Sequence, residues 1–230
     1  HGLPADPQLE MLHRHLTLGP VPPTFRTPSD PLPATARHIH PAVLDSTTMT
    51  AQHDASSTLA LDWLLERSGR PTVYFTLGTV FHQESGDLFS RVLAGLSELE
   101  ANIIVTVGRQ IDPAELGHQP TNVRIHRFVP QEVLLPHCDV VVCHAASLSV
   151  IVALACGAPL VLLPMGAHRP LNAHRVHAPG LARVLEPRPA TTVDAHPAAR
   201  QPLRPPHHRD AAAPPQPAPP TRHTPPTTLN

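Results

Sequence analysis

The chain has 230 residues, and its 17 Lys and Arg side chains balance 18 Asp and Glu side chains, so its formal net charge is −1. This balance gives no electrostatic footprint for nucleic acid or for an anionic membrane surface. The longest apolar run, residues 150–165, is too short for a membrane helix and is interrupted by Gly157 and Pro159. We therefore expect no membrane span and no nucleic-acid partner.

The cysteines and histidines show no metal-binding spacing. Cys138, Cys143 and Cys156 form no CxxC pair, and the 18 histidines include neither HExxH nor paired Cys/His zinc spacing. Cys143 and Cys156 lie in apolar runs, where reduced thiols pack as small apolar groups. We expect a cytoplasmic protein with no metal and no cofactor.

Proline divides the chain into three parts. The first part is rich in proline and has no apolar periodicity, which is typical of a loop or linker. In the last part, 13 of the 44 residues from Pro187 onward are proline, and few are large aliphatic residues, so this part cannot bury enough apolar surface to order itself. We predict a linker over residues 1–40, one domain over residues 41–187 and a disordered Pro-rich tail over residues 188–230.

Within the central domain, apolar runs alternate with segments of helical spacing. The predicted elements are a helix over 59–66, a strand over 72–79, a helix over 88–99, strands over 102–107 and 123–128, a helical turn over 131–135, a strand over 139–143, a helix over 147–156, a strand over 160–163, a helix over 171–177 and a strand over 182–185. Strand–helix alternation in units of about 30 residues predicts an α/β fold with a parallel, doubly wound sheet. No GxGxxG follows a predicted strand, which argues against a hydride-transfer dehydrogenase.

Four segments carry a family resemblance. They are RPTVYFTLGTV (70–80), RFVPQEVLLPHCDVVVCH (127–144), GAPLVLLPMGA (157–167) and RPLNA (169–173). In this order they resemble the C-terminal, donor-binding domain of nucleotide-sugar-dependent glycosyltransferases with the two-domain GT-B fold, and bacterial macrolide and natural-product glycosyltransferases in particular. The resemblance implies a Rossmann-like sheet, the C-terminal half of a GT-B fold.

The same resemblance implies a reaction. Such hexosyltransferases move a hexose or deoxyhexose from a UDP- or dTDP-sugar to a small hydrophobic acceptor, without a metal and with inversion, often in antibiotic biosynthesis. Their first domain holds the acceptor and usually a catalytic histidine. This chain resembles only the second domain, so we assign no catalytic residue and expect the base and the acceptor site in a missing N-terminal domain.

Two predicted loops would contact the ends of the donor. Gly78 and Thr79 close the strand over 72–79, and the family uses this loop beside the diphosphate and the sugar. A glycine there lets the main chain approach a ligand. Val129, Pro130 and Gln131 match the family segment that lies against the nucleobase, where backbone groups and the Gln131 amide could pair with a pyrimidine edge.

His144 stands between a predicted strand and a predicted helix. In the family this histidine and the turn after it, typically HGGxGT, bind the diphosphate. Free N–H groups at a helix N-terminus, together with the helix dipole, favour an anion, and histidine adds a donor. Without the resemblance, a structural histidine would be the simpler interpretation.

The turn after His144 departs from the family pattern. Ala145, Ala146 and Leu148 replace the three family glycines, whereas Ser149 keeps a hydroxyl in place of threonine and Ser147 could cap the helix. If the family backbone needs positive φ there, alanine strains it and leucine obstructs the phosphate. The sequence thus predicts a turn that forms but binds diphosphate less tightly.

A second departure is His168–Arg169, where the family commonly has an acidic residue followed by glutamine that bind sugar hydroxyls. Arginine only donates hydrogen bonds, so Arg169 could pair with phosphate instead. A solvated pair in a loop is the alternative interpretation.

Three hypotheses for the function stay open. The first is the donor-binding half of a glycosyltransferase. The second is a truncated or frameshifted, catalytically inactive remnant, which the lost glycines and the change in composition after LARVLEP favour. The third is a nucleotide-sugar epimerase, for which the sequence offers no pair of acid and base carboxylates.

Overall fold

The structure of the protein is a computed structural model that describes residues 6–7, 10–19, 32–39, 55–78, 87–178, 180–187 and 192–201. Thr79 and residues 202–230, which make up most of the predicted tail, lie outside these ranges.

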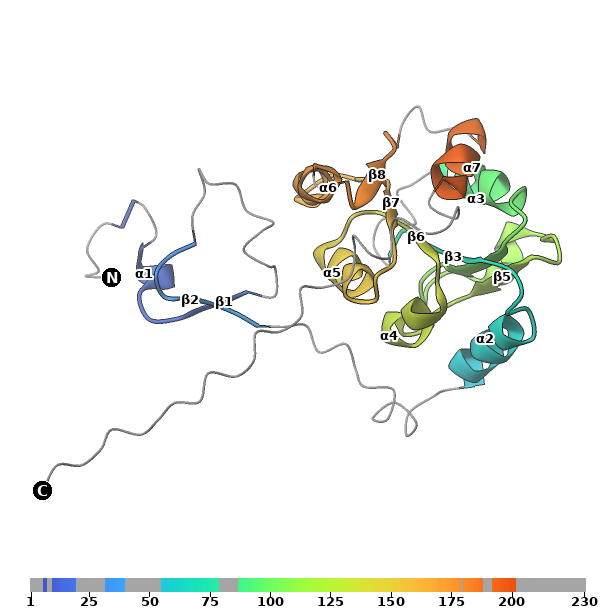
Figure 1. Ribbon diagram of the computed structural model, residues 1–230, viewed down its shortest axis with the longest axis horizontal. Helices are drawn as coiled ribbons and strands as arrows, with labels where there is room; N and C mark the ends of the chain where they lie inside the picture. Colours follow the sequence, from blue (N-terminus) through green and yellow to red (C-terminus); the bar gives the residue numbers. More distant parts are fainter. Residues whose placement is uncertain are drawn as a thin grey trace, which may run out of the picture.

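A six-stranded parallel sheet forms the centre of the domain (Figure 1). Its order is β5-β4-β3-β6-β7-β8, so the chain builds outward from β3 in one direction and then from β6 in the other. The strands are β3 (Thr72–Thr76), β4 (Asn102–Thr106), β5 (Val123–His126), β6 (Val140–Cys143), β7 (Leu160–Leu162) and β8 (Ala182–Val184). The predicted doubly wound α/β fold is confirmed.

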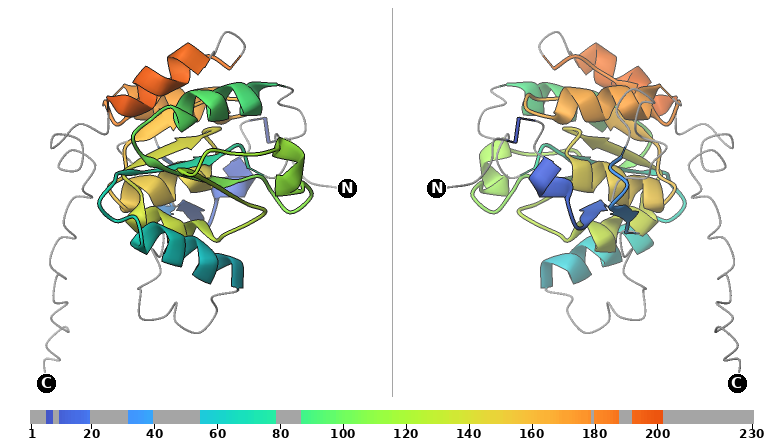
Figure 2. Two further views of the ribbon diagram at one scale, coloured as in Figure 1. Left: turned by 90° about the vertical axis from the view of Figure 1, so that its right-hand side faces the viewer. Right: turned by 90° about the vertical axis from the view of Figure 1, so that its left-hand side faces the viewer.

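Helices cover both faces of this sheet, as the two side views in Figure 2 show. Residues of α3 (Leu88–Ser97) and α7 (Thr192–Arg200) share one buried cluster with Val73 and Phe75 of β3. The other cluster contains Tyr74 and residues of the remaining helices. Those helices are α2 (Ala55–Leu65), α4 (Gln131–Leu134), α5 (Ser147–Ala155) and α6 (Arg169–His177). Because β3 and β4 are buried on both faces, they appear in the sequence as nearly continuous apolar runs.

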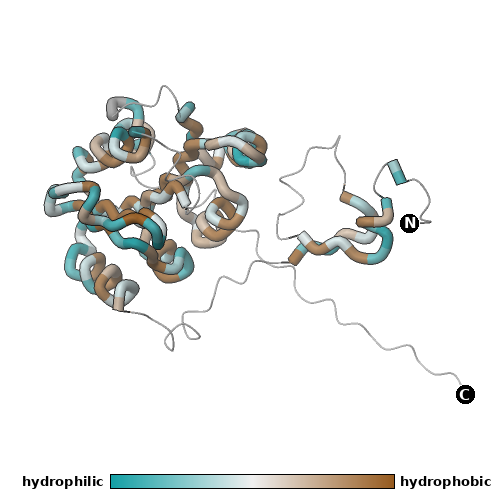
Figure 3. Tube along the Cα trace, turned by 180° about the vertical axis from the view of Figure 1, so that it is seen from behind, coloured by the Kyte–Doolittle hydropathy of each residue, from teal (hydrophilic) through white to brown (hydrophobic). Residues whose placement is uncertain are grey.

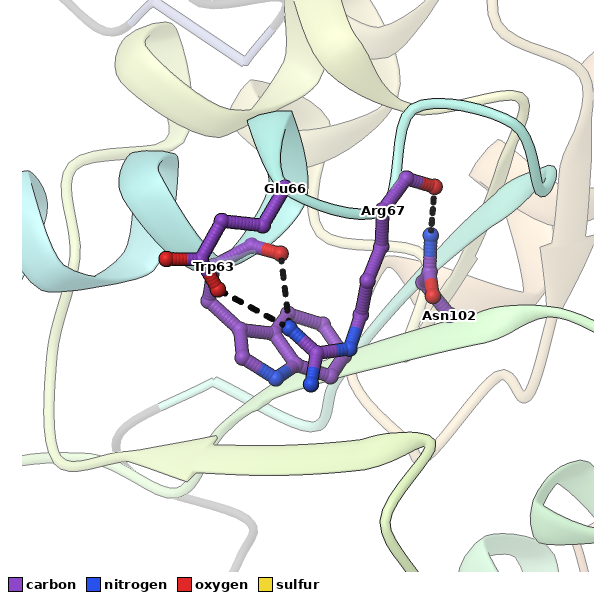
Figure 4. A network of polar contacts seen from close by, with 4 residues as sticks. All are labelled: Trp63, Glu66, Arg67 and Asn102. Atoms are coloured by element: carbon purple, nitrogen blue, oxygen red, sulfur yellow. Dashed lines mark hydrogen bonds and ion pairs between the residues drawn. The ribbon is translucent and has the colours of Figure 1, made fainter.

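A small polar network fixes the end of α2 to the sheet (Figure 4). The guanidinium of Arg67 lies over the ring of Trp63, 4.9 Å from its centroid. The side-chain amide of Asn102, the first residue of β4, donates a 3.0 Å hydrogen bond to the Arg67 carbonyl oxygen. Trp63 is the only tryptophan of the chain, so its fluorescence reports on this helix and on unfolding.

The first part of the chain contains elements that the sequence does not predict. Instead of a featureless linker, the structure has α1 (Glu10–His13) and a parallel pair formed by β1 (Thr17–Gly19) and β2 (Ala36–His38). Three-residue strands are too short to show a period, and their pairing is non-local. None of the described residues in 10–39 is buried, although apolar stretches run along this unit (Figure 3).

The prediction of disorder from residue 188 onward is wrong for residues 192–200, which form α7. Ala195, Ala198 and Ala199 are buried against the α3 side of the sheet. Alanine packs closely with little loss of side-chain entropy, so this helix docks without the large aliphatic residues whose scarcity suggested disorder.

Two helices begin earlier than predicted. The helix expected from residue 59 begins at Ala55, and the one expected from residue 171 begins at Arg169. Pro170 lies in the first turn of α6, where a missing N–H costs no helical hydrogen bond and the fixed φ suits the helix.

Candidate functional site

The strand order reverses between β3 and β6, and ligands of open α/β sheets bind beyond the carboxyl ends of the strands at such a point. Thr76 of β3 pairs in register with Cys143 of β6. The residues that follow, Gly78 and His144, therefore reach the same edge of the sheet. Both were predicted to belong to the site.

Gly78 and His144 are in direct contact. A Cβ atom added to Gly78 would lie 2.6 Å from His144 Cε1 and 2.8 Å from its Nε2, and Gly78 has a φ of +76°. The imidazole ring thus occupies the space that any other side chain at this position would need. Glycine is required here by both the backbone conformation and the neighbouring ring.

His144 is held in its neutral form. Burial, followed by the positive charges of Arg169 and His168, lowers the pKa of His144 to about 4. Near neutral pH its ring therefore offers one donor and one acceptor nitrogen. The effect of the two neighbours also shows that the loop after β7 brings its cationic residues close to His144.

The turn after His144 leads directly into α5, whose first turn has no side-chain cap. Ala145 has a φ of +65°, and Ala146, the N-cap, is extended and has no side-chain oxygen to accept from the helix. The first intrahelical bond runs from the N–H of Val150 to the Ala146 carbonyl oxygen. The N–H groups of residues 147–149 thus form an uncapped helix end, which attracts an anion.

The two serines of the turn have different environments. The side-chain amide of Asn172, on α6, donates 3.0 Å hydrogen bonds to the Ala145 carbonyl oxygen and to Ser147 Oγ. Ser147 remains half-buried, whereas Ser149 is only 7% exposed and accepts a 3.0 Å hydrogen bond from Gln131 Nε2. Leu148 extends into solvent, with 70% of its surface exposed.

The segment predicted to meet a nucleobase lies at the carboxyl end of β5. Val129 is buried, and Gln131 begins α4 directly after Pro130. Phe128, which the sequence did not nominate, is half-buried at this edge with the Arg109 guanidinium 4.4 Å from its ring centroid. The sequence feature that could have identified Phe128 is an aromatic residue at a strand end, directly before the Val-Pro-Gln segment.

The loop after β7 contributes His168 and Arg169. His168 is exposed at the N-cap of α6, and Arg169 is half-buried in its first turn, where burial lowers the pKa of its guanidinium. The structure thus gathers Gly78, His144, residues 145–149 and the His168–Arg169 pair around the end of β6. The Gln131–Ser149 hydrogen bond joins the segment of Val129 and Gln131 to them.

Across the described ranges, no group of three or more His, Cys, Asp or Glu side chains is arranged to hold a metal ion. No helix in these same ranges is long and apolar enough to cross a membrane.

The family model for the C-terminal domain of erythromycin biosynthesis protein CIII-like proteins matches residues 90–218. Tylactone mycaminosyltransferase of Streptomyces fradiae is 36% identical over 132 residues, covering 55% of this chain and 28% of that protein. The 4'-demethylrebeccamycin synthase of Lentzea aerocolonigenes is 33% identical over 196 residues, covering 85% of this chain and 44% of that protein.

A crystal structure of the glycosyltransferase VinC in complex with dTDP shares the fold, with a TM-score of 0.62 and 28% sequence identity, covering 83% of this chain and 44% of VinC. The chain therefore spans less than half the length of the relatives that it matches here.

Proposed function

The chain belongs to the erythromycin biosynthesis protein CIII-like family as a C-terminal domain of macrolide-type GT-B glycosyltransferases, and from this premise we propose that it is the donor-binding half of such an enzyme. Its reaction would transfer a hexose or deoxyhexose from a UDP- or dTDP-sugar to a small hydrophobic acceptor. The dTDP bound to VinC and the tylactone in the name of a relative support these substrate classes.

The observation that carries the proposal is the uncapped N-terminus of α5 at the point where the strand order reverses. The uncapped first turn of α5 follows His144 directly, and the charge of Arg169 acts on the neutral His144 ring. A helix N-terminus with a neighbouring guanidinium suits a diphosphate, because the anion gains hydrogen bonds and charge pairing together.

The remaining site residues take roles from their places around this anion site. We assign the diphosphate to His144, the backbone of residues 145–149, the Ser147 hydroxyl and Arg169. The nucleobase would lie against Val129, Gln131 and Phe128. Gly78 and His168 would lie on the sugar side. Thr79 lies outside the described residues, so we assign it to the same side from the family resemblance alone.

This arrangement would help the nucleoside diphosphate to leave when the sugar is transferred. When an acceptor hydroxyl attacks the anomeric carbon with inversion, negative charge grows on the departing diphosphate. The α5 N-terminus and Arg169 can stabilise that charge because they are already oriented toward it. We propose that the transfer needs no metal ion. The base that deprotonates the acceptor would lie outside this chain.

A second part of the protein would complete the site. A two-stranded parallel pair is not stable alone, and parallel sheets are normally covered on both faces. The β1–β2 unit nevertheless exposes between 45% and 68% of Met11, Leu12, Leu16, Leu18 and Ile39. We propose that these residues pack against an acceptor-binding domain.

A cytoplasmic location fits the proposal. Cys138, Cys143 and Cys156 are all free thiols in the structure, as is usual in a reducing compartment. We propose no nucleic-acid partner.

Isothermal titration calorimetry of the whole chain with dTDP and UDP tests donor binding. We expect saturable binding that weakens roughly tenfold in Arg169→Gln, because one charge-assisted contact is lost. Arg70→Gln is the matched control, since Arg70 is exposed before β3 at the opposite edge of the sheet. If millimolar dTDP and UDP give no heat, the inactive-remnant hypothesis, which the strained φ of Ala145 favours, replaces this proposal.

A further inference from the structure

An arginine lies over the aromatic ring of the segment assigned to the nucleobase. Arg109 Cζ is 4.4 Å from the centroid of the Phe128 ring. The two residues meet because β4 and β5 remain paired up to their ends, where the Val107 N–H donates to the His126 carbonyl oxygen at 3.1 Å. Gly108, with a φ of +91°, turns the chain directly before Arg109. The guanidinium therefore lies at the carboxyl edge of the sheet, which also holds the candidate site.

Phe128 provides this guanidinium with a fixed support. It is half-buried, and its carbonyl oxygen accepts a 3.3 Å hydrogen bond from Ser56 Oγ in the first turn of α2. The next residue, Val129, is buried. An aromatic ring attracts a guanidinium through its face, and this contact uses none of the N–H groups that lie in the guanidinium plane. Arg109 can therefore be held by Phe128 and still donate hydrogen bonds to a ligand.

The side-chain N–H groups of Arg109 have no acceptor in the part of the chain that the structure describes. The two carboxylates of the same loop are already used. Asp112 Oδ2 accepts from Arg127 at 2.7 Å and its Oδ1 accepts from the Ala114 N–H at 3.1 Å. Glu115 Oε1 accepts from the Asp112 N–H at 3.3 Å. Arg109 is exposed, so its donors are available to a ligand beside the nucleobase segment.

We infer that Arg109, supported by Phe128, recognises the pyrimidine base of the donor by donating hydrogen bonds to a carbonyl oxygen of the base; the inference rests on the proposed function. Uracil and thymine both present such carbonyl oxygens, so one contact serves UDP and dTDP. The diphosphate is a less suitable partner, because β3 lies between β4 and β6. The ends of β4 and β6 are therefore separated by roughly 10 Å, and the anion site is at the end of β6.

The test is calorimetry of the whole chain with dTDP and thymidine monophosphate (dTMP), which share the base and differ by one phosphate. We expect Arg109→Gln to weaken both probes by the same factor, roughly 3- to 10-fold. Arg109→Lys keeps the charge but loses the planar set of donors, so it should also bind both probes more weakly than the wild type. Arg124→Gln is the matched control, because Arg124 is an exposed arginine of β5 whose Cζ lies 6.0 Å from the Trp63 ring centroid, and it should bind as the wild type does.

Three results would overturn the inference. A larger loss of affinity for dTDP than for dTMP in Arg109→Gln would mean that Arg109 acts on the diphosphate. Wild-type affinity in Arg109→Lys would mean that only the charge matters. Unchanged or tighter binding by Arg109→Gln, with Trp63 fluorescence showing that it is folded, would mean that the guanidinium only covers the Phe128 ring. In each case the proposed function survives, because the wild type still binds dTDP. Absence of dTDP and UDP binding by the wild type would instead remove both.

Discussion

The turns after β3 and β6 cross the same edge of the sheet, and each contains a residue with positive φ, Gly78 at +76° and Ala145 at +65°. At Gly78 a Cβ would collide with the His144 ring. At Ala145 the Cβ is present, and the residue is fully buried in the cluster that includes Val150 of α5. The turn after β3 therefore has no room for a side chain at Gly78. The turn after β6 accommodates the methyl group of Ala145, and its only cost is backbone strain.

This difference changes the interpretation of the HAASLS turn. The sequence treats all three lost family glycines alike, but only Ala145 needs a left-handed backbone. Ala146 is extended, and Leu148 is helical with its side chain in solvent. The altered turn still leads into an uncapped helix N-terminus at this edge of the sheet.

The largest expected effect comes from Gly78→Ala, compared with Gly180→Ala. Both glycines have nearly the same φ, +76° and +79°, but no atom lies within 4 Å of a Cβ added at Gly180. We expect each variant to lose about 1–2 kcal/mol from backbone strain. Gly78→Ala should lose a further 1–3 kcal/mol, roughly, from the displaced imidazole. Urea unfolding followed by Trp63 fluorescence measures the unfolding free energy of both variants. Equal decreases would mean that the His144 ring can move aside at no cost in free energy.

His144 makes stability depend on pH. Its folded pKa of about 4 lies below the unfolded value of 6.5, so between these values the unfolded chain binds more protons. The free energy of unfolding is therefore highest above pH 6.5 and falls as the pH drops toward 4. At pH 4.5 we expect a loss of roughly 2 kcal/mol from this residue.

Urea midpoints of the wild type and His144→Asn at pH 7 and pH 4.5 isolate this contribution. The variant should lose less stability on acidification than the wild type. His137→Asn, at an exposed histidine, is the control and should behave like the wild type. A His144→Asn variant with the full pH dependence would show that the ring near Gly78 titrates normally.

The strands and helices of the sheet could be predicted from the sequence because the evidence for them is local. Apolar runs such as residues 139–143 and the helical spacing of 88–99 fall on β6 and α3. The position of His144 at a strand end follows from the same pattern. The contact of its ring with Gly78 does not, because the two lie 66 positions apart in the chain (144 − 78) and only the pairing of β3 with β6 joins them.

The missed features depend on tertiary contacts. The sequence assigned Gln131 to a nucleobase and Ser149 to a phosphate, and these roles stay predictions, but their side chains are bonded to each other. Arg109 over Phe128 joins the ends of two neighbouring strands. Helix α7 docks through alanines that hydrophobic periodicity does not weigh heavily. In each case the partner, not the residue type, decides the role.

A smaller effect is expected from Asn172→Ala, compared with Asn122→Ala. Asn172 holds the Ala145 carbonyl and Ser147, whereas Asn122 donates to the carbonyls of Ser97, Leu99 and Ala101 at the opposite edge. Each should lose about 1–2 kcal/mol of unfolding free energy. Only Asn172→Ala should also weaken dTDP binding, roughly tenfold by calorimetry. If the two variants bound dTDP with equal affinity, the turn after His144 would not contribute to donor binding.

The smallest effect is expected at Ala145. Ala145→Gly relieves about 1–2 kcal/mol of left-handed strain. It also raises the entropy of the unfolded chain, which costs about 0.5–1 kcal/mol, and removes a buried methyl group worth about 0.8 kcal/mol. These terms nearly cancel, so the unfolding free energy should stay within about 1 kcal/mol of the wild type. Ala153→Gly removes an equally buried methyl from a residue in the helical interior of α5, where no strain is relieved, and should cost more. If both variants lose the same unfolding free energy in urea, Ala145 is unstrained. The turns after β3 and β6 would then differ only in the space around Gly78 and Ala145.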